Sequence, residues 1–560
     1  MKLYDVNEFE NIKEMLETRA VTHKDKIAFY QKNENKEFDE ITYEQLKKDV
    51  DALGTALLHM GLKDKKIAII GKNSYEWAIS YIAIMCGVGV VVPLDKQLAD
   101  NEIKNCLQRI DIDTIIHGKE FEDRLKGMET DTKIKNYISM EDGNLSISDL
   151  ILKGNRLIEE GNREYIDSKI DRDKLASLLF TSGTTSKSKI VMLSQRNIMY
   201  NVTVGQKMIN TKEGDIFFSV LPLSHTLEST CVLLYPLACG SAIVYNDNLK
   251  NLIKDIKATK PTSMMVVPRV VELFYEKITS EIEKKNKVKQ VKIAMALTDL
   301  LGSYGVSLKR KVFKEVHEQF GGNLRLLIMG GAPVNPKISK YFRGLGILAL
   351  QGYGLTECAP LVTFNSDREY ADDSAGMAVP GSEVLIVNPD SDGIGEIIVK
   401  GPQIMLGYYE DEEATKEAIK NGYFYTGDLG KFDEKGFLRI SGRCKNVIVS
   451  SNGKNIFPEE IESLINENQN IKESVVYEEE KGNGRKSLTA EVVLIDEIKQ
   501  RIEQNPEATE EIMEILNEYL KEVNNKLSDY KQVSGIKVRE TDFDKTSTMK
   551  IKRFTTQKRN

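Results

Sequence analysis

A stretch of hydroxyl and lysine side chains, Thr181–Lys189 (TSGTTSKSK), follows directly after the apolar run 178–180. Hydroxyls and successive backbone N–H groups donate hydrogen bonds and lysine adds positive charge, so such a loop suits a polyphosphate. The Gly-x-x-x-x-Gly-Lys-Ser/Thr pattern of common NTPases is absent. Taken alone, the stretch is equally compatible with a polar surface turn.

Two glycine-rich turns follow strongly apolar segments farther along the chain. Gly330–Pro333 (GGAP) follows the run 324–329, and Gly352–Glu357 (GYGLTE) follows the run 348–351. Strands that end together in such turns form a crevice at the carboxyl edge of a parallel sheet, which is the usual ligand site in α/β folds. Glycine also lets a ligand ring approach the backbone closely.

Three other polar residues stand out, although each has an ordinary structural explanation. His225 lies two residues after the apolar segment 217–223, and a lone histidine beside apolar residues is usually structural. Asp428 ends the segment YTGD (425–428). Arg443 comes later in the chain, directly after Gly442. From the residues alone, both Asp428 and Glu357 are more typical of turns than of an active site.

Alternating strand and helix patterns over 42–116 predict an α/β domain with a largely parallel sheet, with Trp77 in its core. Glycine-rich 393–399 predicts a small β subdomain. From Asn446 the pattern restarts, which predicts a separate small α+β domain. The expected fold is therefore a large α/β N-terminal domain with parallel-rich sheets and a β subdomain, followed by a small mobile α+β domain.

Composition narrows the class of protein. A chain of 560 residues with 29% charged side chains is too long for one core, and its net charge of −7 argues against general nucleic-acid binding. The six cysteines lack metal-type spacing and are interpreted as reduced thiols of a cytoplasmic protein. The apolar stretches 81–94 and 231–245 are too short and too interrupted to span a bilayer. Lysines over 284–292 predict a solvated helix face, with attraction to anionic lipid head groups as the alternative.

Five segments, in order, resemble the adenylate-forming (AMP-forming) acyl-CoA synthetases, a superfamily that also contains firefly luciferase and peptide-synthetase adenylation domains. They are Thr181–Lys189, Leu221–Glu228, Gly352–Glu357, Tyr425–Asp428 with Gly442–Arg443, and Lys545–Arg553. Segments 221–228 (LPLSHTLE) and 446–460 (NVIVSSNGKNIFPEE) resemble its long-chain fatty-acid–CoA ligase branch. The resemblance implies an N-terminal AMP- and acyl-binding domain, 1–444, and a mobile C-terminal domain, 445–560, with its hinge at Lys445.

The resemblance also implies roles for individual residues. Thr356 would contact the α-phosphate, Glu357 with Thr184 would bind Mg²⁺, and Asp428 would accept hydrogen bonds from the ribose beside Arg443. The departing phosphates would be held by Thr181, Ser182, Gly183, Thr184, Thr185 and Lys189. The adenine would lie against Gly331, Ala332, Pro333, Gly352, Tyr353 and Gly354, with Tyr353 stacking on the ring.

The remaining implied roles belong to the mobile domain and to the acyl path. Lys550 would bridge the attacking carboxylate and the α-phosphate, and a shift of register would give this role to Lys552. Rotation about Lys445 would then withdraw Lys550 and open a path for CoA. His225 would lie between the acyl pocket and the thiol path, and pantetheine would approach Ser451, Asn452 and Gly453.

The chain departs from the family pattern at several positions, but no charged role is lost. Serine occupies 186 and 188 and isoleucine occupies 190, where the family usually has Gly, Pro and Gly. Gln195 replaces a histidine, Asp544 a proline and Met549 a glycine. Lys189, Glu357, Asp428, Arg443 and Lys550 are all present, so these departures bear on rate more than on reaction type.

The expected activity is ATP- and Mg²⁺-dependent activation of a fatty acid to acyl-AMP, with release of pyrophosphate and transfer of the acyl group to CoA. The expected partners are the fatty acid, ATP and CoA, with no nucleic acid, in the cytoplasm or peripherally at a membrane. One alternative is a fatty-acyl-AMP ligase that loads a carrier protein. The other is a nucleotide- or lipid-binding protein without turnover, which the altered phosphate loop suggests.

Overall fold

The computed structural model of the chain describes residues 2–33, 35–181, 188–246, 249–304, 308–449, 454–480, 486–546 and 551–553. The chain divides into two compact units. The large unit consists of Met1–Glu383 with Val399–Phe424, and the small unit of Val384–Ile398 with Tyr425–Asn560. Each unit has its own sheets and hydrophobic core.

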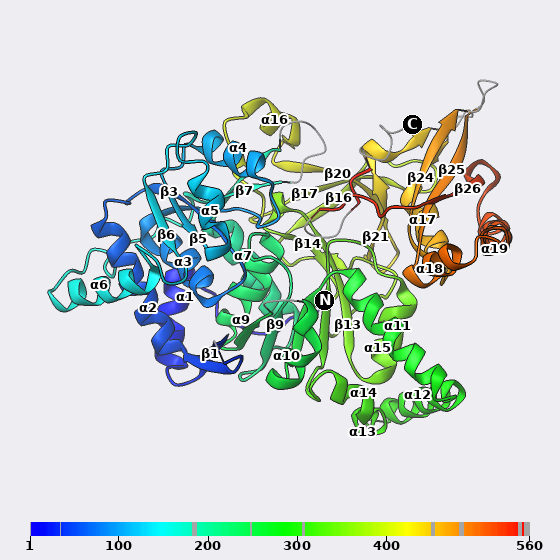
Figure 1. Cartoon of the computed structure of the whole chain (residues 1–560), viewed down its shortest axis with the longest axis horizontal. Helices are drawn as coiled ribbons and strands as arrows, with labels where there is room; N and C mark the ends of the chain where they lie inside the picture. Colours follow the sequence, from blue (N-terminus) through cyan, green and yellow to red (C-terminus); the bar gives the residue numbers. More distant parts are fainter. Residues whose placement is uncertain are drawn as a thin grey trace. The chain divides into compact units, whose positions relative to one another are not determined.

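A nine-stranded sheet in the large unit has the order β15-β14-β13-β12-β11-β9-β10-β1-β2 (Figure 1). Its central strands are mutually parallel, so their carboxyl ends share one edge. The strands that end near the candidate site are β9 (Ile216–Ser219), β11 (Ser263–Val266), β12 (Leu326–Met329) and β13 (Leu348–Gly354). β13 runs past its predicted end at Gln351, because 352–354 pair antiparallel with β14 (Leu361–Phe364).

A seven-stranded sheet in the same unit has the order β18-β8-β7-β4-β3-β5-β6. β3 (Lys65–Ile70), β4 (Gly89–Pro93) and β5 (Thr114–His117) are parallel, which confirms the predicted α/β pattern. At the other end, β7 (Leu175–Phe180) and β8 (Ile190–Ser194) form an antiparallel hairpin. The short strand β18 (Gly407–Tyr408) pairs with β8.

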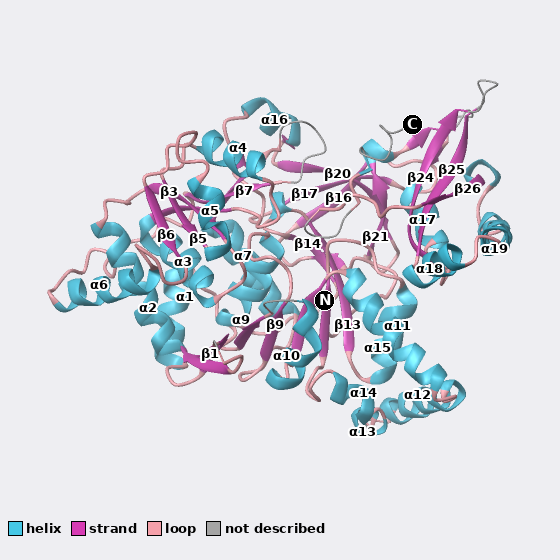
Figure 2. Cartoon of the chain, in the orientation of Figure 1, coloured by secondary structure: helices cyan, strands magenta, loops and turns pink. Residues whose placement is uncertain are grey.

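Helices pack around the strands of both sheets (Figure 2). α2 (Tyr43–His59) begins after Thr42, whose side chain accepts a hydrogen bond from Gln45 N and so caps the helix. Trp77 on α3 (Tyr75–Ala83) is 1% exposed, which confirms its predicted place in the core. Among the described residues, no helix combines the length and hydropathy needed to cross a bilayer.

The small unit contains the β structure predicted around 393–399 and an α+β portion. β20 (Tyr423–Phe432) pairs with β21 (Leu438–Arg443) in the sheet that also contains β16 (Glu383–Val387) and β17 (Gly395–Lys400). The α+β portion consists of β24 (Ile471–Glu480), β25 (Lys486–Leu494), β26 (Val533–Arg539), α17 (Pro458–Ile465), α18 (Asp496–Gln504) and α19 (Ala508–Asn524). The predicted fold class is confirmed, and the boundary after residue 444 with its hinge stays a prediction.

Candidate functional site

The glycine-rich turn after β12 and the glycine-rich end of β13 lie side by side at the carboxyl edge of the nine-stranded sheet. Met329 pairs with Gln351, so Gly330–Pro333 and Gly352–Gly354 leave neighbouring strands at the same level. The side chain of Gln351 ties the two turns together, since its Oε1 accepts from Val334 N at 3.2 Å. Gly331–Pro333 are exposed. The two glycine-rich segments that the sequence placed at one sheet edge are therefore neighbours.

The next turn requires glycine at Gly354 and presents Glu357. A Cβ atom on Gly354 would lie 1.7 Å from the carbonyl oxygen of Pro360, which no side chain could tolerate. This close approach lets Leu355 N donate to Pro360 O at 2.8 Å, so a single helical turn, Thr356–Cys358, is held beside the strands. Asn201 accepts from Leu361 N and donates to Cys358 O, which fixes the turn against α7 (Gln195–Met208).

A tyrosine that the sequence analysis missed connects Glu357 to the phosphate-loop hairpin. Tyr408 donates from its hydroxyl to Glu357 Oε1 at 3.1 Å. The Lys189 ammonium lies over the same ring, 4.4 Å from its centroid. Burial, reinforced by the Glu357 carboxylate, raises the pKa of Tyr408, so the hydroxyl stays protonated and donates. One side chain thus joins a carboxylate and a cation that were predicted separately.

The hairpin of β7 and β8 fixes both ends of the hydroxyl-rich loop. Thr181 N donates to Lys189 O at 3.0 Å, which closes the base of the loop. Arg109 on α4 (Asp100–Ile110) donates to Ser188 O at 2.8 Å. The predicted phosphate-binding residues Ser182, Gly183, Thr184 and Thr185 lie outside the described residues.

The segment after β9 is held by a buried carboxyl. Glu228 Oε1 accepts from Ser219 Oγ at 2.5 Å and from Val220 N at 3.1 Å. Asn73 donates to Leu221 O at 2.7 Å and accepts from Leu223 N at 3.0 Å. The loop that carries the predicted His225 is therefore fixed from both sides by polar side chains. Burial raises the pKa of Glu228 to about 8.

This loop brings His225 to the same edge of the nine-stranded sheet. A Cβ atom built on Gly330 would lie 3.4 Å from Leu227 Cδ2, so the loop lies next to the turn after β12. His225 Nε2 is 3.3 Å from Asp95 Oδ2, and Asp95 follows β4 of the other sheet. No local pattern indicated Asp95, because the contact joins residues far apart in the chain.

In the small unit, Asp428 and Arg443 face each other across two antiparallel strands. They are register partners of β20 and β21, and Arg443 Nε donates to Asp428 Oδ1 at 2.6 Å. Asp428 is buried, and its backbone N–H donates to Thr426 Oγ1 at 3.0 Å. The sheet therefore holds this carboxylate in a defined position, and a carboxylate accepts hydrogen bonds from hydroxyl groups.

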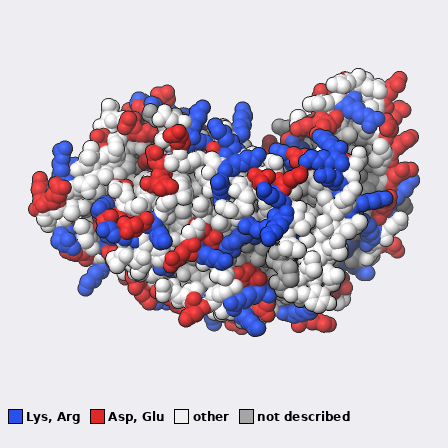
Figure 3. Space-filling model, turned by 90° about the horizontal axis from the view of Figure 1, so that it is seen from below, with Lys and Arg blue, Asp and Glu red and all other residues white. Residues whose placement is uncertain are grey.

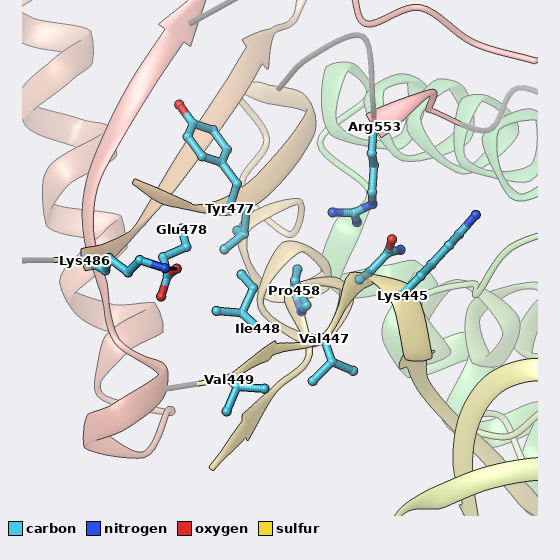
Figure 4. A pocket seen from close by; sticks show the side chains of 11 residues that line it. Lys445, Val447, Ile448, Val449, Pro458, Tyr477, Glu478, Lys486 and Arg553 are labelled. Carbon is cyan, nitrogen blue, oxygen red and sulfur yellow. Dashed lines mark hydrogen bonds and ion pairs between the residues drawn. The ribbon is translucent and has the colours of Figure 1, made fainter. Parts of the chain in front are cut away.

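Beyond Arg443, the small unit contains a pocket of about 400 Å³ next to Lys445 (Figure 4). Val447, Ile448 and Pro458 give it an apolar wall, and Arg553 points toward the segment that carries Lys445. The predicted pantetheine segment Ser451, Asn452 and Gly453 lies outside the described residues.

Lys550 also lies outside the described residues, but the chain on either side of it is anchored. Lys545 and Ile551 form an antiparallel bridge, and Lys545 pairs with Glu473 at 2.6 Å. Arg553 forms an ion pair with the buried carboxylate of Glu462, which also accepts from Val476 N at 2.6 Å. Lys545, Ile551 and Arg553, the described residues on either side of Lys550, are therefore held by contacts within the small unit.

The sequence matches two known family profiles. The profile described as AMP-binding enzyme matches residues 16–409. The chain belongs to the AMP-binding enzyme family. The profile of the AMP-binding enzyme C-terminal domain matches residues 445–559 of this AMP-binding enzyme. The superfamily predicted from the five segments is confirmed.

Relatives of this AMP-binding enzyme include ligases of the predicted branch. Long-chain-fatty-acid–CoA ligase FadD15 of Mycobacterium bovis is 25% identical over 586 residues, covering 98% of this chain and 96% of the relative. Long-chain-fatty-acid–CoA ligase 6 of Mus musculus is 27% identical over 488 residues, 81% of this chain and 69% of the relative. The chloroplastic long-chain-fatty-acid–[acyl-carrier-protein] ligase AEE15 of Arabidopsis thaliana is 27% identical over 555 residues, 85% and 75% of the two chains.

Solved structures share the fold of this AMP-binding enzyme. The anthranilate CoA ligase AuaEII in complex with anthranoyl-AMP has a TM-score of 0.79 at 19% identity, covering 99% of this chain and 98% of that one. ATP-bound MatB from Rhodopseudomonas palustris has a TM-score of 0.75 at 22% identity, covering 98% of each chain. The likeness supports the two-part architecture.

Proposed function

We propose that this AMP-binding enzyme is a long-chain fatty-acid–CoA ligase. A carboxylate oxygen of the acid attacks the α-phosphorus of ATP, the bond to the leaving pyrophosphate breaks, and acyl-AMP forms. The thiol sulfur of CoA then loses its proton, bonds to the acyl carbon and displaces AMP. The observation that carries the proposal is the Lys189–Tyr408–Glu357 contact, which joins the phosphate-loop hairpin to the glycine-rich edge.

The residues of the large unit suit the first step, in which two anions must meet. Lys189 offers positive charge at the end of the hydroxyl-rich loop, where pyrophosphate would leave. Mg²⁺, when bound, supplies a Lewis acid on the phosphates. Among the described residues no cluster of three acidic, histidine or cysteine side chains offers a complete metal site. One carboxylate plus ligand phosphates is the usual Mg²⁺ arrangement, so Glu357 fits it, with Thr184 as a second proposed ligand.

Other predicted roles remain part of this proposal. Asp428 binds the ribose hydroxyls beside Arg443, Tyr353 stacks on adenine, and Lys550 neutralises charge between the acid and the α-phosphate. Rotation about Lys445 withdraws Lys550 before CoA enters near Ser451–Gly453. His225, held through Asp95 and its loop, separates the acyl group from the thiol path.

Pyrophosphate exchange tests the adenylation step. Fatty-acid-dependent exchange of labelled pyrophosphate into ATP should be measurable and should fall by at least about a thousandfold in Lys550→Ala. Thioester formation from preformed acyl-AMP should survive in the same variant. Lys552→Ala is the matched control and should retain exchange. Exchange that persists in Lys550→Ala but disappears in Lys552→Ala would assign the role to Lys552.

A second candidate is a fatty-acyl-AMP ligase that transfers its product to a carrier protein. The similarity to the acyl-carrier-protein ligase AEE15 favours this candidate. Incubation with ATP, palmitate and either free CoA or an acyl-carrier protein distinguishes the two. Acyl-CoA formation at a rate matching exchange supports the first proposal, and product that forms only on the carrier supports the second.

The choice of a long-chain acid rests on the relatives and is tested by the same exchange assay. A panel from acetate to stearate should show the highest kcat/KM for the long members, with differences of about 1–3 kcal/mol for each methylene that the pocket recognises. A maximum at short or aryl acids would contradict this part of the proposal. We also propose a cytoplasmic location with contact at a membrane surface.

A further inference from the structure

Helix α12 (Val288–Ser303) belongs to the large unit and packs through one face only. Val291, Ala294 and Met295 contact the hydrophobic core that also contains residues of α11 (Pro268–Lys284) and α15 (Pro336–Leu345). Thr298 on the same face is 3% exposed. These positions recur at three- and four-residue intervals, so they define the inner face of the helix.

The opposite face of α12 and the residue after the helix are apolar as well. Ile293 is 61% exposed, Leu297 55%, Leu300 57% and Tyr304 79%. Their spacing of three or four residues places all four on one side, about half a turn away from Val291 and Met295. A helix on the surface of a globular protein normally carries polar residues there. We call these four residues the α12 apolar stripe.

Basic residues lie before and after the stripe in sequence. Between 284 and 314 the chain has nine Lys and Arg residues and one acidic residue, Asp299, although the whole chain has a net charge of −7. Lys309 pairs with Asp299 at 2.5 Å, Lys285 with Glu315 at 3.2 Å and Lys314 with Glu318 at 3.6 Å, so the other six basic residues carry the local excess of positive charge. The basic residues are Lys284, Lys285, Lys287, Lys289, Lys292, Lys309, Arg310, Lys311 and Lys314.

The surroundings of α12 are visible in the views of the whole molecule. Helices α12, α13 (Lys309–Val312) and α14 (Lys314–Gln319) lie at the lower edge of Figure 1. Seen from below in Figure 3, Lys and Arg side chains form groups among acidic and uncharged surface. Lys284, Lys287, Lys289 and Lys292 are exposed.

We propose that α12 is an interfacial helix that inserts its apolar stripe into the surface of an anionic lipid bilayer. Large apolar side chains enter the boundary between head groups and acyl chains, while lysines beside them contact anionic head groups. A second copy of the chain is a poorer occupant, because a self-complementary contact would bring two strongly basic segments together. The inference goes beyond the ligase reaction and does not depend on it.

Vesicle binding by the full chain tests this proposal directly. The protein should sediment with vesicles of phosphatidylcholine and phosphatidylglycerol and much less with phosphatidylcholine alone, and high salt should release it. Ile293→Asp with Leu297→Asp should lower partitioning at least about a hundredfold, because two apolar anchors are replaced by charges. Leu152→Asp on α6 (Ile147–Glu159) is the matched control at a 59% exposed leucine and should leave binding unchanged.

A second variant tests the charges and leaves the stripe intact. Lys284→Glu with Lys287→Glu should lower binding to anionic vesicles by about tenfold or more and should leave the weak binding to neutral vesicles unchanged. All substituted side chains are exposed, so circular dichroism and the thermal midpoint should match wild type. Pyrophosphate exchange with a short, water-soluble acid should also match, which separates loss of membrane binding from loss of ligase function.

Each of the following outcomes would overturn the proposal. The wild-type protein sediments with neither kind of vesicle, it binds both kinds equally, or the Ile293→Asp, Leu297→Asp variant binds as well as wild type. The fourth is a concentration-dependent dimer in vesicle-free buffer that the same variant abolishes, since the stripe would then be an interface between copies. Saturable binding of an acidic protein without any vesicle binding would likewise assign the surface to a protein partner.

Discussion

The buried carboxyl of Glu228 predicts a pH dependence of stability that one isosteric substitution should remove. Its side chain is fully buried, and Oε1 accepts from Ser219 Oγ and Val220 N. Oε2 has no hydrogen-bond partner among the described residues. Glu228→Gln keeps the size and the accepting oxygen but cannot ionise. We expect this variant to be more stable than wild type at alkaline pH.

The size of the effect follows from the shift in the pKa of Glu228. Burial raises this pKa from 4.5 to about 8, so between these values the folded protein keeps a proton that the unfolded chain releases. The stability contribution of Glu228 is therefore complete below about pH 4.5 and is lost progressively as the pH rises to about 8. A shift of about 3.5 units corresponds to a loss of about 5 kcal/mol.

The other titratable groups that face Glu228 do not change their protonation state in this pH range. Burial raises the pKa of Cys231 to about 12, and the negative charge of Glu228 adds to that shift. Burial also raises the pKa of Tyr245 on β10 (Ala242–Tyr245) well above its usual value, with a further contribution from Glu228. Both side chains are neutral between about pH 5 and about pH 8.5, so Glu228 dominates the local change.

Urea unfolding at about pH 5 and about pH 8.5 measures the effect. From the lower to the higher pH, the free energy of unfolding of the wild-type protein should decrease. This decrease should be several kcal/mol larger than the decrease for Glu228→Gln. Glu413→Gln, at an exposed position on α16 (Glu412–Ala418), is the matched control and should keep the wild-type pH dependence. The reasoning is refuted if Glu228→Gln retains the full pH dependence or is the less stable protein at the higher pH.

Three further substitutions test individual contacts. Asp428→Asn should raise the KM for ATP by about tenfold or more, because charge-assisted hydrogen bonds to a ligand contribute about 1.5–3 kcal/mol; an unchanged KM would contradict the ribose role. Tyr408→Phe keeps the ring but removes the donor to Glu357, so the Mg²⁺ concentration for half-maximal exchange should change by about fivefold, and an identical titration curve would count against this link. Arg553→Ala leaves the Glu462 carboxylate buried without its cation, so it should destabilise the small unit by about 3–5 kcal/mol. Hydrogen exchange measures this loss of stability, and a loss below about 1 kcal/mol would contradict the role of the ion pair.

The sequence predicted those parts of the site that local chemistry determines. Apolar runs followed by glycine-rich turns located β12 and β13, and the structure brings Gly331 and Gly352 to neighbouring positions on one edge. Asp428 and Arg443 were placed together only through the family resemblance, and the structure makes them register partners of two strands joined by a short turn. The glycine-rich segments could be located from a few consecutive residues, because a strand and the turn beside it form locally.

Contacts between distant segments were not predictable in the same way. Tyr408 contacts Glu357 because β18 pairs with β8. The sequence of neither strand indicates which strand it pairs with. The burial of Glu228 depends on packing from β9 and β10, although its position in the segment 221–228 was recognised. Lysines over 284–292 were predicted as one solvated helix face; they are exposed, but they span the end of α11, the connection 285–287 and the start of α12. The exposed stripe around Leu297 was not predicted, because it is defined by which face of α12 packs against the core.

The pairing of β18 with β8 also limits how this enzyme can be recombined with its relatives. Met192 lies opposite Gly407 and Val191 opposite Tyr408, so two stretches that lie far apart in the gene form one structural block. A chimaera that exchanges one of these stretches alone would combine halves that evolved with different partners. Crossover points that keep both stretches from the same parent should give a much larger fraction of active hybrids.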